Sequence, residues 1–185
     1  MLGFNNKNMK KYSYLEGKNM LKGKNIREIT LRPIIEEDIK LLTTWLNKEY
    51  ILKWYEEPDE WLTEINERNG TYSWIHHFIV MDENIPIGFC QYYDCFDAIE
   101  LEDWYSVDQK NNTFSIDYLI GNEAYLRKGY GKAIVRLLTD TIKDKEQAKQ
   151  IIVQPDKENL PSNNVLLSNG YIFDKEKDYY YKLLD

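Results

Sequence analysis

A short turn with two glycines and three cations has the composition of a phosphate-binding site. It spans residues 127–132 (Arg-Lys-Gly-Tyr-Gly-Lys), after an apolar run that ends at Gly121 and directly before an apolar-periodic segment. Glycines let the backbone turn tightly and approach a ligand, and the free N–H groups at the start of a helix bind anions. A lone Gly-x-Gly is also compatible with an ordinary strand-to-helix turn, so the motif alone does not identify a ligand.

The turn matches neither of two common nucleotide-binding motifs. A dinucleotide fingerprint requires a third glycine where this chain has Ile134. A P-loop requires four residues between its glycines, followed by Lys-Ser/Thr, and neither feature is present. Any phosphate compound bound here must therefore be held in another way.

One carboxylate precedes the turn inside the predicted strand. Asp117 stands between Ile116 and Leu119, although aspartate is uncommon in strand interiors. Partial burial would raise the pKa of Asp117 toward neutrality, where a carboxylate can take a proton from an amine. The alternative is an aspartate that is satisfied by a local hydrogen bond or that binds a cation without moving protons.

Aromatic and acidic side chains predict a site for a cation. Trp54 and Tyr55 lie in one connection, and a loop over residues 94–111 carries Glu100, Glu102 and Asp103. Carboxylates bind ammonium groups, and aromatic faces stack on sugar rings or cations. Each of these residues taken singly fits a solvated loop charge or a packing group equally well.

The elements that must position these groups follow from periodicity. Strands are predicted over residues 26–34, 74–81, 85–93, 113–120 and 150–153, with a closing hairpin from 171–173 and 179–184. Helices are predicted from Glu36 to Leu46, from Pro58 to near Gly70, after Gly131, and over residues 159–168. This order predicts a single α/β (α+β) domain with one mixed, strongly twisted sheet flanked by helices.

Charge divides the 185-residue chain in two. Residues 1–25 hold six lysines and one glutamate, whereas residues 26–185 carry a formal charge of −12. We expect 1–25 to form a flexible basic extension and 26–185 to form the domain. A domain this acidic is not expected to bind nucleic acid, and no apolar run is long enough to predict a membrane span. With two cysteines only, Cys90 and Cys95, a reducing cytoplasm is expected.

Metal binding is not expected. His76 and His77 are adjacent in a predicted strand, so their side chains face opposite sides of the sheet. No other group of histidines and carboxylates has metal-ligand spacing. A Cys–His nucleophile built on Cys90 or Cys95 is a less favoured alternative.

The order of the motifs resembles the GCN5-related N-acetyltransferase (GNAT) superfamily, and within it the aminoglycoside 6′-N-acetyltransferases. The resemblance covers residues 26–185 and rests on short segments in order along the chain: Trp45-Leu46-Asn47, Trp54-Tyr55, Ile85-Pro86-Ile87-Gly88, Ser115-Ile116-Asp117, Lys128-Gly129-Tyr130-Gly131, Asn159-Leu160 and Asn169-Gly170-Tyr171. The family turn begins with Arg or Gln, whereas this chain has Leu126. That residue matters less than the glycines, because backbone N–H groups hold the phosphates.

The resemblance implies acetyl-CoA as co-substrate and assigns roles to residues. Asp117 would be the general base, and the Leu119 N–H would stabilise the oxyanion. The cofactor would be held by the backbone of Leu119 and Ile120, by Asn159, and by the turn residues Arg127, Lys128, Gly129, Tyr130, Gly131 and Lys132. The acceptor would meet Trp54, Tyr55, Glu100, Glu102, Asp103 and Asp117. For Asn159, helix capping is the competing role.

Two further positions depart from the family pattern. Leu166 stands where the family often has a tyrosine general acid, so an unassisted thiolate or another donor must serve. Gln154 stands before Pro155, where aminoglycoside enzymes often have an acidic residue. The expected function is direct acetyl transfer to a small polycationic amine, most simply the 6′-amine of an aminoglycoside, by a monomer or homodimer. Acylation of a siderophore-type or protein amine, or a non-catalytic acyl-CoA-binding module, are the alternatives.

Overall fold

The structure is a computed structural model that describes residues 28–184. The expected extension over residues 1–25 lies outside this range. Seven strands form one sheet in the order β1-β2-β3-β4-β5-β7-β6. The strands are β1 (Ile29–Pro33), β2 (His76–Asp82), β3 (Ile85–Asp94), β4 (Thr113–Ile120), β5 (Gln150–Val153), β6 (Ile172–Asp174) and β7 (Tyr179–Leu183). The strand pairs are antiparallel except for the parallel pair β4–β5. The predicted mixed sheet is confirmed.

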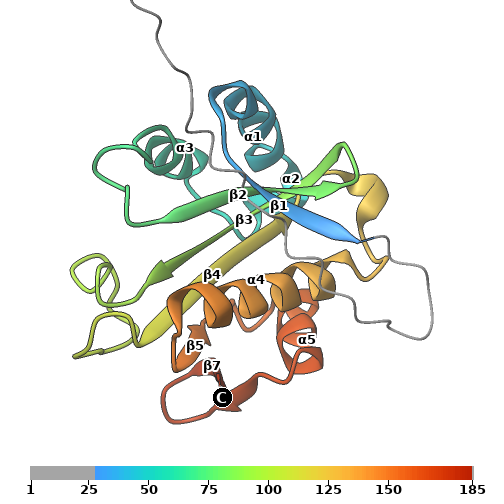
Figure 1. The fold of residues 1–185 in the computed structure, drawn as a ribbon. Helices are drawn as coiled ribbons and strands as arrows, with labels where there is room; N and C mark the ends of the chain where they lie inside the picture. Colours follow the sequence, from blue (N-terminus) through green and yellow to red (C-terminus); the bar gives the residue numbers. More distant parts are fainter. Residues whose placement is uncertain (1–27, 185) are drawn as a thin grey trace, which may run out of the picture.

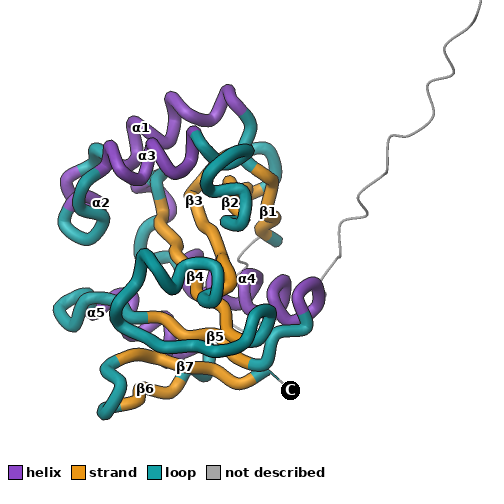
Figure 2. The backbone as a smooth tube through the Cα atoms, turned by 90° about the vertical axis from the view of Figure 1, so that its left-hand side faces the viewer, coloured by secondary structure: helices purple, strands orange, loops and turns teal. Residues whose placement is uncertain are grey.

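Helices cover both faces of this sheet (Figure 1). The helices are α1 (Ile39–Leu46), α2 (Glu49–Leu52), α3 (Pro58–Asn66), α4 (Tyr130–Glu146) and α5 (Leu160–Ser168), and two short 3₁₀ helices span Glu36–Asp38 and Glu123–Tyr125. One core, which includes Leu42 and Ile65, lies under α1 and α3, and the other, which includes Ile134 and Leu166, lies under α4 and α5. The view turned by 90° shows the α1–α3 layer at the end of the molecule opposite the β6–β7 hairpin (Figure 2). None of the helices in the described chain is long and apolar enough to cross a membrane.

Most predicted boundaries lie within two residues of the observed ones. The connection between α1 and α3, for which sequence predicts no helix, contains the short helix α2. Glu57 precedes Pro58 with a left-handed backbone (φ 53), so α3 begins at a sharp reversal. The loop predicted over residues 94–111 begins at Asp94, the last residue of β3, and contains no helix or strand beyond it.

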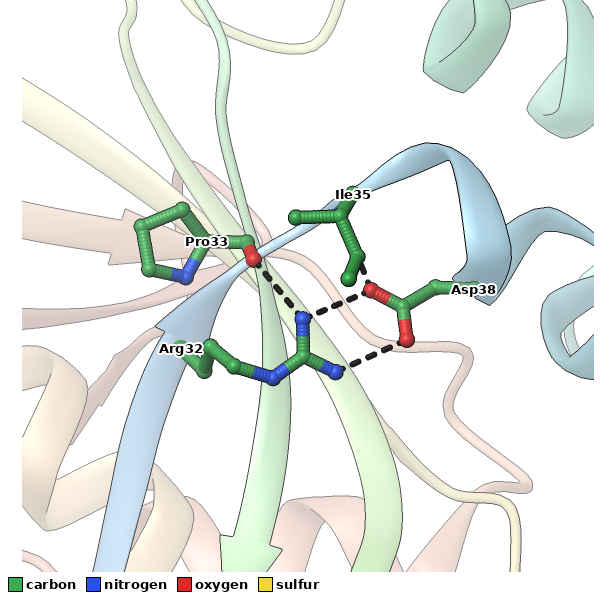
Figure 3. A network of polar contacts seen from close by, with 4 residues as sticks. All are labelled: Arg32, Pro33, Ile35 and Asp38. Carbon is green, nitrogen blue, oxygen red and sulfur yellow. Dashed lines mark hydrogen bonds and ion pairs between the residues drawn. The ribbon is translucent and has the colours of Figure 1, made fainter.

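An ion pair joins the first strand to the first helix (Figure 3). The two terminal guanidinium nitrogens of Arg32 donate to the Asp38 carboxylate at 2.8 Å, and the Ile35 N–H donates to the same carboxylate at 2.9 Å. Burial alone would raise the pKa of Asp38, but the hydrogen bonds from Arg32 and Ile35 and the Arg32 charge hold it below its usual value. The bidentate contact thus fixes how α1 leaves the sheet.

Candidate active site

The sheet opens where β4 and β5 part. Their parallel pairing covers only Thr113–Ser115 of β4 against Gln150–Ile152 of β5, while β4 continues to Ile120. The remaining part of β4 keeps its register with β3 on the other side. A gap therefore forms on the β5 side of β4, and backbone groups that a neighbouring strand would bind face this gap.

A cavity of about 680 Å³ occupies this region and joins two groups of predicted residues. Asp117 and Glu102 line it together with Trp54 and Tyr55, as predicted for an acceptor site. From the predicted cofactor residues, it is lined by Leu119, Ile120, Arg127, Gly129, Gly131, Lys132 and Asn159. The structure thus brings the carboxylate and the Gly-x-Gly turn to one cavity.

The start of α4 leaves room for a ligand. Gly129 adopts φ 90, a conformation that disfavours a side chain, and it directly precedes the first helical residue, Tyr130. A Cβ atom built on Gly131 would lie 3.4 Å from the Val165 side chain, so a larger residue would fill the space between α4 and α5. The first N–H groups of α4 have no carbonyl partner in their own helix. These features, with Arg127 and Lys132 beside them, fit an anionic group such as a pyrophosphate.

Two turn residues sit outside the cavity lining. Lys128 is exposed, and the Tyr130 side chain is buried, where its hydroxyl donates to Asp82 at 3.2 Å and its ring packs on Tyr125. Tyr130 therefore anchors the start of α4 to the end of β2. The predicted role of Tyr130 in cofactor binding therefore does not involve its side chain.

Asp117 has the electrostatics expected of a base. It is partly buried at the cavity wall and accepts a hydrogen bond from Gln91 Nε2 at 3.1 Å. Burial, with the nearby carboxylates of Glu64 and Glu102, raises its pKa to about 7, although the Gln91 hydrogen bond opposes that rise. A carboxylate with a pKa near neutrality is matched to proton transfer at physiological pH.

Gln91 and Glu64 are site residues that sequence reasoning missed. Gln91 is almost fully buried, and its Oε1 has no hydrogen-bond partner within residues 28–184. Such an orphan acceptor is costly unless a donor from the cavity reaches it. Glu64 lies on α3 and contacts His77 Nε2 at 3.0 Å. Gln91 lies opposite Asp117 in the β3–β4 register, a pairing that no local signal in the sequence marks.

Strand register corrects the expectation for Leu119. The Cys95 N–H donates to Thr113 O at one end of the β3–β4 ladder, and the Gly121 N–H donates to Ile87 O at the other. Hydrogen-bonded pairs alternate in an antiparallel ladder, so the Leu119 N–H points to β3. The even-numbered residues Tyr118 and Ile120 direct their backbone groups to the gap instead.

Two tyrosines from the α2 region satisfy part of this free edge. The Tyr55 hydroxyl donates to Tyr118 O at 2.7 Å and accepts from the Tyr118 N–H at 3.0 Å. The Tyr50 hydroxyl donates to Ile120 O at 2.8 Å. Tyr55, predicted as a substrate wall, therefore also takes the place of a neighbouring strand. Burial raises its pKa well above the usual range, so its hydroxyl stays neutral.

Aromatic residues form the walls on the Asp117 side. Four of the chain's five tryptophans line the cavity, namely Trp54, Trp61, Trp74 and Trp104. Three of them pack edge-on against tyrosines: Trp61 with Tyr55, Trp74 with Tyr93 and Trp104 with Tyr105, at centroid distances of 4.9, 5.9 and 4.5 Å. This bracing makes the walls rigid and leaves aromatic surface for a cation or a sugar ring.

Of the three acidic loop residues predicted to contact substrate, one lines the cavity. Glu102 lines the cavity and accepts from Trp104 Nε1 at 2.8 Å. Burial raises its pKa, as do the nearby charges of Asp103 and Glu64, against the Trp104 hydrogen bond. Glu100 and Asp103 are exposed and lie outside the lining, so their contact with substrate stays a prediction.

Asn159 and Leu166 lie on α5. Asn159 caps this helix, since its Oδ1 accepts from the Ser162 N–H at 3.2 Å, and it also lines the cavity. The two roles that sequence left open are therefore compatible. Leu166 is fully buried in the core against α4 and does not line the cavity.

Comparison with known proteins finds a matching family and related enzymes. Residues 34–179 match the family described as Acetyltransferase (GNAT) domain. The aminoglycoside N(6′)-acetyltransferases type 1 of Klebsiella pneumoniae and Serratia marcescens are each 28% identical over 138 residues, which cover 71% of this chain and 68% of each relative.

Solved structures share the fold. Aminoglycoside acetyltransferase AAC(6′)-Ib in complex with coenzyme A and kanamycin has a TM-score of 0.69 at 23% identity, over 84% of this chain and 95% of that one. Spermidine N-acetyltransferase from Vibrio cholerae, in complex with CoA and spermine, has a TM-score of 0.65 at 15% identity, over 84% and 95%.

Proposed function

The chain belongs to the GNAT acetyltransferase family and is an acetyl-CoA-dependent N-acetyltransferase, and we propose that its acceptor is a small polycationic amine. The leading candidate is the 6′-amine of an aminoglycoside, the substrate named for the curated relatives. One observation carries the proposal. A carboxylate with a pKa of about 7 shares a cavity with a glycine turn fit for pyrophosphate.

The cofactor end uses backbone groups and two cations. We assign the CoA pyrophosphate to the first N–H groups of α4, with Arg127 and Lys132 beside them. Gly129 and Gly131 permit the close approach, and the Ile120 backbone and Asn159 lie along the arm. Lys128, which is exposed, would act only through its charge at longer range. Acetyl-CoA supplies the activated acetyl group when it is bound.

The acceptor end holds and deprotonates the amine. Asp117 takes a proton from the incoming ammonium group, directly or through a water molecule, and passes it to bulk water, which frees the nitrogen lone pair. Once the nitrogen has bonded to the acyl carbon, Asp117 takes the second proton from it. Gln91 Nε2 fixes the Asp117 carboxylate, and the unpaired Gln91 Oε1 accepts from a second N–H of the same amine. The Ile120 N–H, directed to the gap, donates to the charge that develops on the acyl oxygen. Asp117 then returns its proton to water.

Charge and aromatic surface define the acceptor class. Glu64 and Glu102 provide negative charge near Asp117, which favours an acceptor with more than one ammonium group. Acetylation removes one positive charge and its hydrogen-bond donors, which explains how the reaction would disarm a cationic drug. The buried thiols of Cys90 and Cys95 support a reducing cytoplasm as the compartment.

A polyamine is the second candidate acceptor. The four tryptophans suit alkyl chains between ammonium groups, and one structural neighbour is a spermidine N-acetyltransferase. Thiol release from acetyl-CoA, measured with a panel of aminoglycosides, polyamines and peptide amines, tests both. We expect the highest kcat/KM with aminoglycosides that carry a 6′-amine. A higher value for spermidine would favour the polyamine, and no release with any amine would overturn the proposal.

A further inference from the structure

Two hydroxyl groups face each other on the α5 side of the cavity. Tyr118 Oη and Ser162 Oγ are 2.8 Å apart, and both residues line the cavity. Ser162 is the third residue of α5, where Asn159 holds its N–H. The phenol is thus placed by a helix whose first turn is itself capped.

The position of this pair relative to Asp117 follows from strand geometry. Successive side chains of β4 point to opposite faces, so Asp117 and Tyr118 lie on either side of the sheet. Asp117 meets Gln91 on the face of α1 and α3, whereas Tyr118 packs toward α4 and α5. In direct acyl transfer, the amine and the departing sulfur lie on either side of the acyl carbon. A proton acceptor on one face and a donor on the other match that requirement.

The usual donor is missing from α5. Leu166 occupies the position at which a tyrosine would be expected and is fully buried away from the cavity. Burial raises the pKa of Tyr118 to about 12; the Ser162 hydrogen bond opposes this rise, and the charge of Asp117 adds to it. Tyr118 therefore keeps its proton between pH 7 and 9. A protonated phenol is therefore available where a leaving group would need it.

We propose that Tyr118, positioned by Ser162, is the proton donor to the CoA sulfur, an inference that rests on the proposed acyl-transfer site. The amine nitrogen bonds to the acyl carbon, and the carbon–sulfur bond breaks with its electron pair on sulfur. Tyr118 gives its hydroxyl proton to that sulfur, and its phenolate recovers a proton from water through the Ser162 hydroxyl. With the amine proton passing to Asp117, the products are one amide and one thiol.

Calorimetry of CoA and desulfo-CoA tests this donor without any acceptor amine. At about pH 9 a thiol is partly ionised, so the wild type can stabilise the thiolate by donating to it. We expect the wild type to bind CoA several-fold more tightly than desulfo-CoA, and Tyr118→Phe to bind the two equally. Tyr171→Phe is the matched control, since Tyr171 Oη also pairs with a hydroxyl, Thr139 Oγ1 at 2.9 Å, but lies outside the cavity lining. Retention of the wild-type preference in Tyr118→Phe would overturn the proposal.

Turnover provides the second measurement. We expect Tyr118→Phe to lower kcat about 10- to 100-fold with little change in acceptor KM. This loss is at the lower end of the range for general acids, because a thiolate is already a good leaving group. Ser162→Ala should lower kcat less and leave the CoA preference partly intact. A change of less than twofold in Tyr118→Phe would contradict the assignment. Inactivity of the wild type with every amine would instead count against the proposed acceptor and leave the calorimetric result standing.

Discussion

The two ends of the cavity are built in different ways. The proposed cofactor end is dominated by one continuous segment, residues 127–132, which would act chiefly through backbone N–H groups and the absence of side chains at Gly129 and Gly131. The acceptor end is assembled from side chains of α3, β3, β4 and the 94–111 loop, represented by Glu64, Gln91 and Glu102. A short motif can specify the first, whereas only the folded chain brings the second together.

The ends also differ in charge. Arg127 and Lys132 line the cofactor end, and three carboxylates are coupled electrostatically at the acceptor end. Opposite charge at the two ends suits an anionic cofactor and a cationic amine, and disfavours exchange of the two ligands between subsites. Substitutions at one end should therefore leave binding at the other end largely intact.

The largest expected effect comes from Asp117→Asn. Loss of the base should lower kcat about 10²- to 10⁴-fold, while the Kd for CoA, set at the other end, changes less than twofold. Steady-state kinetics and calorimetry measure the two quantities. Asp140→Asn, on the exposed side of α4, is the control. Near-normal turnover of Asp117→Asn would remove this residue as the base.

The same substitution should stabilise the fold at high pH. Because the pKa of Asp117 is about 7 in the folded chain against an ordinary value of 3.8, ionising it above pH 7 costs folding free energy. That cost is absent below pH 4, appears as pH rises between the two values, and is removed by Asn. We expect Asp117→Asn to gain about 1–3 kcal/mol at pH 8 and almost nothing at pH 4, measured by urea unfolding.

Gly129→Ala should have the next largest effect, this time at the cofactor end. A side chain at φ 90 costs about 1–2 kcal/mol, so the turn shifts and the Kd for CoA rises about tenfold. The acceptor KM should change little. Gly70→Ala, where a Cβ would meet only an ordinary contact at 3.6 Å, is the matched control. Equal losses in the two variants would argue against a specific role for the turn.

Glu64→Gln and Glu102→Gln should act on the acceptor alone. Removing one carboxylate should raise KM about 3- to 10-fold for an amine with several ammonium groups, and less for a monoamine. Each change also removes a charge that raises the pKa of Asp117, so activity should extend to lower pH. A similar KM increase for monoamines and polyamines would contradict the electrostatic role.

The smallest effect is expected from Glu100→Gln and Asp103→Asn. Both residues are exposed and lie outside the cavity lining, unlike Glu102 in the same loop. We expect changes in KM of less than twofold, measured with the acceptor that responds to Glu102→Gln. A response equal to that of Glu102→Gln would show that the loop closes over the substrate.

Sequence predicted the fold well because its signals are local. Period-two apolar runs and glycine punctuation located β4 and β5 without error, and Pro58 marked the start of α3. The helix α2 was not predicted, because four residues are too few for a helical period to be detected.

Prediction of the site was uneven for the same reason. Asp117 was identifiable because an aspartate inside an apolar strand is unusual, and the turn because its two glycines are separated by a single residue. Glu64 and Gln91 lie 53 and 26 positions before Asp117, and nothing local marks them. The direction of the Leu119 N–H depends on the β3–β4 register, which a single strand cannot reveal.

The pH dependence of kcat/KM for the acceptor tests the central claim most directly. With acetyl-CoA saturating and the acceptor below its KM, the wild type should lose activity as pH falls, with a midpoint near 7, because protonated Asp117 cannot accept a proton. The residual activity of Asp117→Asn should lack this transition, and Glu64→Gln should shift it to lower pH. A wild-type profile that stays flat to pH 5, or a transition that persists unchanged in Asp117→Asn, would contradict the assignment of the base.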